Sequence, residues 1–274
     1  MDPASIAIGA AVGLLRSARS ANAAANDGVI ARMLGPWADS FGKDLATRRE
    51  ERRARNIGRI LTAADGIGGD GSPNSRVLGE VLEQGSWCES EIASRYLAGV
   101  LAGSRSSTGE DDSGLPWARL LGGLSGSELA LHYVVYATIR DADPERHHNL
   151  SNGQVASSTI IHLPAQYWTH VTGYGGDTSS TVIGLQRVGL LGEALLCRPD
   201  GEMYLTASIA GIELFARGHG IARPDYEMFQ IEARAPHLGE LLDEVMVGYD
   251  GPPATASWTT SWSTVTSRFA QSQA

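Results

Sequence analysis

The chain has 274 residues and is 42% hydrophobic, enough for a core in one large or two small domains. Its net charge of −9 is uneven: residues 1–64 hold ten Arg/Lys against six Asp/Glu, and residues 65–274 hold twelve against twenty-five. The main body therefore repels phosphate backbones. Two cysteines are too few for a disulfide scaffold and favour a reducing, cytoplasmic location.

Residues 1–65 are predicted to form an N-terminal helical arm. Its uncharged run, residues 3–15, is shorter than the about 20 apolar residues of a membrane-spanning helix. Packing on protein is therefore favoured, and membrane insertion stays open as an alternative. An amphipathic stripe follows at three- and four-residue spacing. We expect self-association through this arm, with the candidate residues Ile6, Ile8, Val12, Leu15, Ile30, Leu34, Trp37 and Phe41.

Arginine and glutamate are intermixed within residues 43–59. This pattern is typical of a solvated helix with ion pairs along its surface. A patch that binds nucleic acid or anionic lipid is the alternative. The weak candidates for nucleic-acid contact, which include one residue of a later helix, are Arg48, Arg49, Arg52, Arg53 and Arg187.

Residues 66–124 are predicted as a helical core. Ser72, followed by a proline, has the pattern of a helix N-cap, and a second helix is expected from Ser90. A polar loop over residues 103–114 precedes a short third helix over residues 115–124.

Residues 125–220 carry a different order of elements. Ser125 and Glu128 have capping-box spacing and open a helix that is apolar nearly all round. The turn at residues 141–148 mixes carboxylates and histidines, but it lacks a paired-His spacing. A metal site and an enzymatic role there are disfavoured. One short apolar element is expected within residues 159–171.

Two strands are then predicted around a Pro-Asp-Gly turn, at residues 193–197 and 202–206. Helices are expected on either side, at residues 181–191 and at residues 207–217, the latter closed by Gly218. Helices around a two-stranded wing indicate a winged-helix-like module. The net negative charge of this module favours packing against protein over binding to DNA.

Residues 221–274 are predicted as a C-terminal helix followed by a tail rich in Ser, Thr and Trp. Trp258 and Trp262 lie four residues apart in this polar tail and are candidates for partner binding. Docking of the tail onto its own body is an equal alternative. The predicted fold is therefore mainly α: a helical bundle followed by a winged-helix-like module with one β-hairpin.

Four short motifs stand in a characteristic order. Residues 96–102 read Tyr-Leu-Ala-Gly-Val-Leu-Ala, and residues 124–130 read Leu-Ser-Gly-Ser-Glu-Leu-Ala. Residues 185–191 read Leu-Gln-Arg-Val-Gly-Leu-Leu, and residues 204–206 read Tyr-Leu-Thr. Together they resemble the abortive-infection alpha (Abi-alpha) family, although the first motif has Tyr where the family tends to carry Trp.

The resemblance covers roughly residues 34–218 and implies a role in bacterial defence against phage. It supplies no catalytic residues. We therefore expect a non-enzymatic protein without a cofactor or metal, which acts through self-assembly or contacts with a phage or host protein. A winged-helix transcriptional regulator is the alternative. A membrane-perturbing effector that acts through the N-terminal apolar segment is a second alternative.

Overall fold

The computed structural model describes residues 48–142, 150–172, 178–196, 202–222 and 246–258. This part of the chain is mainly helical, which confirms the predicted class. The helices are residues 48–67, α3 (Ser75–Ser86), α4 (Glu91–Gly103), α5 (Leu115–Gly122), α6 (Gly126–Ala142), α8 (Asn152–Ser158), α9 (Ala165–Thr172), α10 (Thr178–Arg187) and α11 (Ile209–Gly218). The strands are β1 (Ser72–Pro73), β2 (Arg105–Ser106), β3 (Thr159–Leu163), β4 (Ala194–Leu196), β5 (Met203–Thr206) and β6 (Thr255–Trp258).

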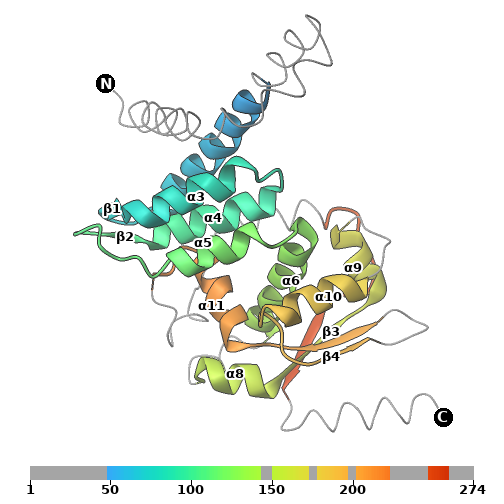
Figure 1. Cartoon of the computed structure of the whole chain (residues 1–274). Coiled ribbons are helices and arrows are strands. Elements are labelled where there is room, and N and C mark those ends of the chain that lie inside the picture. The colour runs from blue at the N-terminus through green and yellow to red at the C-terminus, as the bar shows by residue number, and fades with distance from the viewer. Residues whose placement is uncertain (1–47, 143–149, 173–177, 197–201, 223–245, 259–274) are drawn as a thin grey trace, which may run out of the picture.

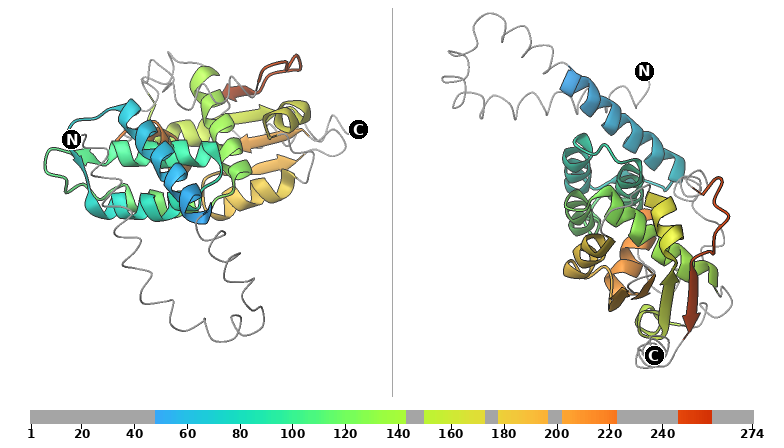
Figure 2. Two further views of the ribbon diagram at one scale, coloured as in Figure 1. Left: turned by 90° about the horizontal axis from the view of Figure 1, so that it is seen from above. Right: turned by 90° about the vertical axis from the view of Figure 1, so that its right-hand side faces the viewer.

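The elements form two regions that share their central helices. Helices α3, α4 and α5 gather at one end, the sheet lies at the other, and α6 and α11 lie between them (Figure 1). The turned views keep the same separation, and the helix at residues 48–67 lies on the side away from the sheet (Figure 2). One cluster of buried apolar side chains runs through both regions, from Ile60 to Ala216.

The start of α3 differs from the predicted start at Ser72. Asn74 is the N-cap, and its side-chain oxygen accepts hydrogen bonds from backbone N–H groups of the first turn. Its amide nitrogen also donates to the Gly109 carbonyl at 3.1 Å, so that one side chain caps the helix and holds a distant loop. Ser72 and Pro73 instead form β1, paired antiparallel with β2. The predicted N-cap is therefore wrong.

Two glycines of α4 allow α11 to approach closely. A Cβ atom on Gly99 would overlap the backbone of Gly218, and a Cβ atom on Gly103 would lie 3.1 Å from the carbonyl oxygen of Gly220. The small residues at these positions therefore bring the end of α11 directly against α4.

The predicted capping box opens α6 as expected. The Ser125 hydroxyl accepts the Glu128 N–H at 3.2 Å, and the Glu128 carboxylate accepts the Ser125 N–H at 2.7 Å. Every residue from 131 to 137 is buried, and the helix contacts α4, α10, α11 and β6. The prediction of a helix buried on several sides is confirmed.

The larger sheet has the strand order β4-β5-β3-β6 and is antiparallel throughout. The predicted hairpin supplies β4 and β5, but β3 and β6 come from segments in which no separate strand was predicted. The expectation of a single β-hairpin is therefore wrong. The apolar element expected within residues 159–171 is in fact a strand followed by α9, because Pro164 separates the two. A short apolar run does not by itself distinguish these conformations.

Both helices beside the hairpin end differently from the prediction. Gly189, with φ of 75°, ends α10: its N–H donates to the Gln186 carbonyl and the Leu190 N–H donates to the Leu185 carbonyl. This Schellman motif stops the helix at Arg187. Residues 188–191 were predicted to be helical and are not. Gly220, with φ of 82°, follows the end of α11 in the same way, and it replaces Gly218 as the terminating glycine.

Candidate functional site

The outward face of α10 is the first candidate site. Ser180, Ile183 and Arg187 are exposed and recur at three- and four-residue spacing, whereas Val182 and Leu185 are buried on the opposite side. Ile183 keeps 59% of its surface accessible, among the largest values for an apolar side chain in the described chain. The face is therefore mixed apolar and polar, with Arg187 as its one cation.

A close contact joins α10 to the start of α6. A Cβ atom on Gly184 would overlap the carboxylate of Glu128, so a larger residue at this position would require the Glu128 side chain to move. Gly184 is buried together with Val182 and Leu185, and Ile183 lies on the opposite, exposed side of the helix. The contact with Glu128 also places a carboxylate beside α10, and that negative charge opposes the approach of a phosphate backbone.

Hydrogen bonds fix the end of α10. The Tyr136 hydroxyl donates to the Leu190 carbonyl at 2.7 Å, and the Gln186 amide donates to the Gly192 carbonyl at 2.7 Å. These bonds tie the turn after α10 to α6 and to the start of the hairpin. The exposed face is thus presented by a rigid element, as binding surfaces require.

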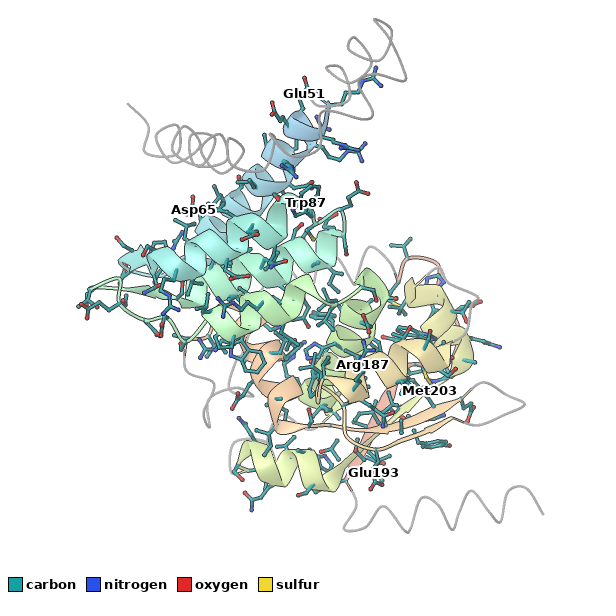
Figure 3. All side chains as sticks on the ribbon, viewed as in Figure 1. Glu51, Asp65, Trp87, Arg187, Glu193 and Met203 are labelled. Atoms are coloured by element: carbon teal, nitrogen blue, oxygen red, sulfur yellow. The ribbon has the colours of Figure 1, made fainter. Side chains whose placement is uncertain are left out.

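The candidates for nucleic-acid contact fall into two places: Arg48, Arg49, Arg52 and Arg53 lie together on the helix at residues 48–67, and Arg187 lies on α10. Arg52 pairs with Glu89 at 2.8 Å, and the Arg53 guanidinium lies 3.6 Å from the ring centre of Trp87. Arg187 lies far from the helix that carries the other arginines, whose position Glu51 marks in Figure 3. Sequence reasoning missed Trp87, although it is 65% exposed, because it lies in a turn and belongs to no periodic pattern.

The other predicted site residues divide between described and undescribed parts of the chain. All eight self-association candidates and Trp262 lie outside the described residues, as do residues 143–148 of the mixed carboxylate and histidine turn. Trp258 is half-buried in β6 and packs against the core. This position is compatible with the docking of the tail onto its own body.

A buried polar chain links α4, α6 and α11. The Tyr96 hydroxyl donates to Nδ1 of His132 at 2.7 Å, and Nε2–H of His132 donates to the Gly211 carbonyl at 3.0 Å. Burial lowers the pKa of His132 to about 3, against a smaller opposing effect of the Gly211 hydrogen bond. His132 is therefore neutral near pH 7 and has a structural role.

Within the described ranges, no three His, Cys, Asp or Glu side chains are grouped so that they could hold a metal ion. Nor does any helix in those ranges have the length and apolarity needed to cross a membrane. In comparisons with known proteins, no family model, no curated protein and no solved structure matches the chain.

Proposed function

We propose that the winged-helix-like module expected within residues 125–220 is formed by residues 152–206. Support comes from the order α8, β3, α9, α10, β4, β5 and from the antiparallel strand order β4-β5-β3. In such modules the helix before the hairpin is the usual contact helix. That position is taken here by α10.

We further propose that the protein is a non-enzymatic, cytoplasmic component of bacterial phage defence that acts through protein contacts. The observation that carries the contact mode is Ile183, exposed on the outward face of α10. Covering a large apolar side chain on a rigid helix with a protein surface lowers the free energy of the complex, because apolar area is removed from water. The role in defence rests on the Abi-alpha resemblance of the four sequence motifs.

A phage challenge tests this proposal with a matched pair of variants. Across a panel of phages, fewer plaques should form on cells that carry the protein than on cells without it. Ile183→Asp should abolish the protection. Burying a carboxylate against the partner without a charged or hydrogen-bonding group opposite it costs too much free energy. Ile209→Asp is the control, because Ile209 is a comparably exposed isoleucine, at 51%, on a different helix. Equal protection by both variants would contradict a role for α10.

The second candidate is a winged-helix DNA-binding regulator, which the exposed Arg187 on α10 favours. It requires duplex binding that weakens steeply with salt and depends on phosphate contacts. Arg187→Ala should then weaken binding and reduce the salt slope by about one. Nanomolar, salt-dependent binding by the unaltered chain would favour this candidate over protein contacts.

A further inference from the structure

Trp87 lies at the end of α3, in the turn that leads to α4, and 65% of its surface is exposed. Two side chains of the first described helix hold the backbone on either side of it. The Asn56 amide donates to the Ser86 carbonyl at 3.3 Å, and the Arg59 guanidinium donates to the Cys88 carbonyl at 3.2 Å. The exposed indole is therefore presented by a turn that is fixed on both sides, as a preformed binding surface requires.

The helix that lies beside Trp87 in Figure 3 is rich in arginine. Residues 48–59 hold six arginines and two glutamates, in a chain whose overall charge is −9. The Arg53 guanidinium lies 3.6 Å from the ring centre of Trp87 and covers one face of the indole, so the exposed area belongs to the other face and to the ring edges. Arg49 is exposed one turn before Arg53, and no acidic side chain of the described ranges pairs with it.

The carboxylates at Glu89 and Glu83 reduce this positive charge without cancelling it. Glu89 is paired with Arg52 at 2.8 Å, so the two form a neutral unit. Glu83 lies one turn before the indole in α3 and has no cationic partner in the part of the chain that the structure describes. Against it stand Arg49 and Arg53, and the charge beside the indole is therefore positive.

A single ring in a cationic surface suits a nucleic-acid base. The other large apolar side chains that are exposed in the described residues, Ile183, Ile209 and Val247, belong to other elements. The core of a protein interface and a membrane anchor each need several apolar side chains together, whereas a base needs one aromatic face. In a duplex the base faces are hidden within the stack, so only an unstacked base of a single strand can lie on Trp87.

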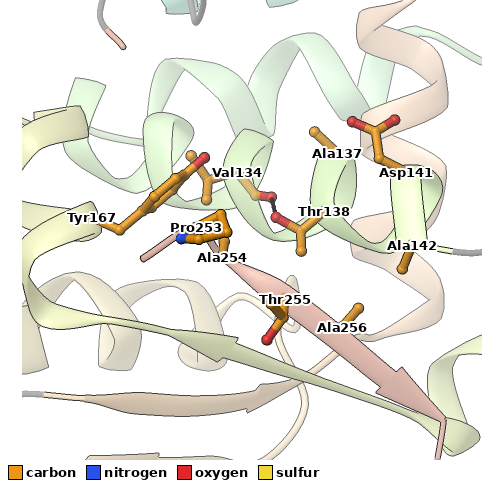
Figure 4. Close-up of a pocket in the computed structure, with 10 residues that line it drawn as sticks. All are labelled: Val134, Ala137, Thr138, Asp141, Ala142, Tyr167, Pro253, Ala254, Thr255 and Ala256. Carbon is orange, nitrogen blue, oxygen red and sulfur yellow. Dashed lines mark hydrogen bonds between the residues drawn. The ribbon is translucent and has the colours of Figure 1, made fainter. Parts of the chain in front are cut away.

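We propose that Trp87, Arg53 and Arg49 form a binding site for single-stranded nucleic acid. One base stacks on the open face of the indole, and the adjacent phosphates contact the two guanidinium groups. The site is distinct from the outward face of α10. It is also distinct from the cavity of about 370 Å³ that Figure 4 shows between α6 and β6. The inference therefore goes beyond the proposed protein contacts.

Fluorescence anisotropy with the full chain tests this site. The probes are a labelled oligothymidylate and a labelled oligouridylate of about twelve nucleotides, and a DNA duplex of the same length. The single strands should bind in the micromolar range, with a salt slope of about −1.4 for two phosphate contacts. The duplex should bind at least about fivefold more weakly, because it offers no base face. Tighter binding of one single strand identifies DNA or RNA as the ligand. Equal binding of the duplex, or binding of anionic vesicles but of neither single strand, would overturn the proposal.

Stacking is tested at the indole itself. Trp87→Ala should weaken binding of the single strand by about fivefold or more at every salt concentration and leave the salt slope unchanged. Trp87→Phe should retain most of the affinity, because it keeps an aromatic face. Val247→Ala is the control, at an apolar residue that is still more exposed. Equal affinities of Trp87→Ala and Val247→Ala would rule out stacking.

The charges are tested in both directions. Arg49→Ala should reduce the salt slope by about 0.7, whereas Arg76→Ala, at the other end of α3 from Trp87, should leave it unchanged. Glu83→Gln should tighten binding by about twofold, because it removes a negative charge near the phosphates. A damaged fold cannot produce such a gain. An unchanged slope in Arg49→Ala, or no gain in Glu83→Gln, would reject the site.

Discussion

The hydroxyl of Tyr96 lies 2.7 Å from Nδ1 of His132, and both side chains are fully buried. Because Nε2 of His132 donates to the Gly211 carbonyl, Nδ1 must accept, and Tyr96 must be the donor. The pair therefore sets one tautomer of His132 and joins three helices through a single ring.

The first prediction concerns the pH dependence of stability. The pKa of His132 is about 3 in the folded chain, whereas a free histidine has a pKa of 6.5. The unfolded chain therefore binds the extra proton as the pH falls below 6.5, and stability is lost progressively from there down to about pH 3. At pH 5 the loss should be about 2 kcal/mol relative to pH 8.

Urea titrations of the unaltered chain and of His132→Asn, at pH 8 and at pH 5, measure this loss. The variant will be less stable at both values, but its stability should fall by about 2 kcal/mol less between them. Parallel losses in the two proteins would show that His132 already binds a proton in the folded state.

A second prediction ranks the two buried tyrosine hydroxyls. The Tyr136 hydroxyl donates to the Leu190 carbonyl and accepts the Ser208 N–H at 2.9 Å, whereas that of Tyr96 serves His132 alone. Tyr136→Phe should thus destabilise by about 2–4 kcal/mol and Tyr96→Phe by about 1–2 kcal/mol, because each unsatisfied buried group costs about 1–3 kcal/mol. Chemical denaturation of both variants gives the order, and the reverse order would contradict this account.

A third prediction uses two helical glycines as a matched pair. A Cβ on Gly99 would overlap the backbone of α11, but a Cβ on Gly79 in α3 would meet no atom within 4 Å. Gly99→Ala should therefore destabilise by several kcal/mol, on the order of the largest core effects. Gly79→Ala should stabilise by about 0.5–1 kcal/mol through helix propensity. Thermal unfolding measures both, and a similar Tm shift in the two variants would refute the close contact.

A fourth prediction concerns the first 42 residues of the N-terminal arm, which lie outside the described residues. Its apolar stripe leads us to expect self-association of the full chain, whereas a chain shortened to begin at Lys43 should be monomeric. Light scattering at about 10–50 micromolar, where weak interfaces still assemble, distinguishes the two. If the full chain and the shortened chain are both monomeric, the prediction is contradicted. Partition of the full chain into liposomes would favour the membrane alternative.

Local patterns in the sequence predicted the features that local chemistry controls. The capping box at Ser125, the buried helix α6 and the positions of β4 and β5 each depend on residues within one or two turns of each other. Even so, Asn74 and not Ser72 caps α3, and its amide also bonds to Gly109, which lies far along the chain. The mainly helical class followed from periodicity alone.

The tertiary structure decided which surfaces face outward and which strands meet. Ile183 lies among apolar neighbours in the sequence, and only the packing of α10 through Val182 and Leu185 leaves it facing solvent. In the same way, the sequence of β6 was predicted as a loop because its Thr, Ala and Ser residues show no alternation of apolar and polar side chains. Its pairing with β3 joins segments about a hundred residues apart. Strand pairing and helix rotation are set by non-local contacts, which a single sequence does not record.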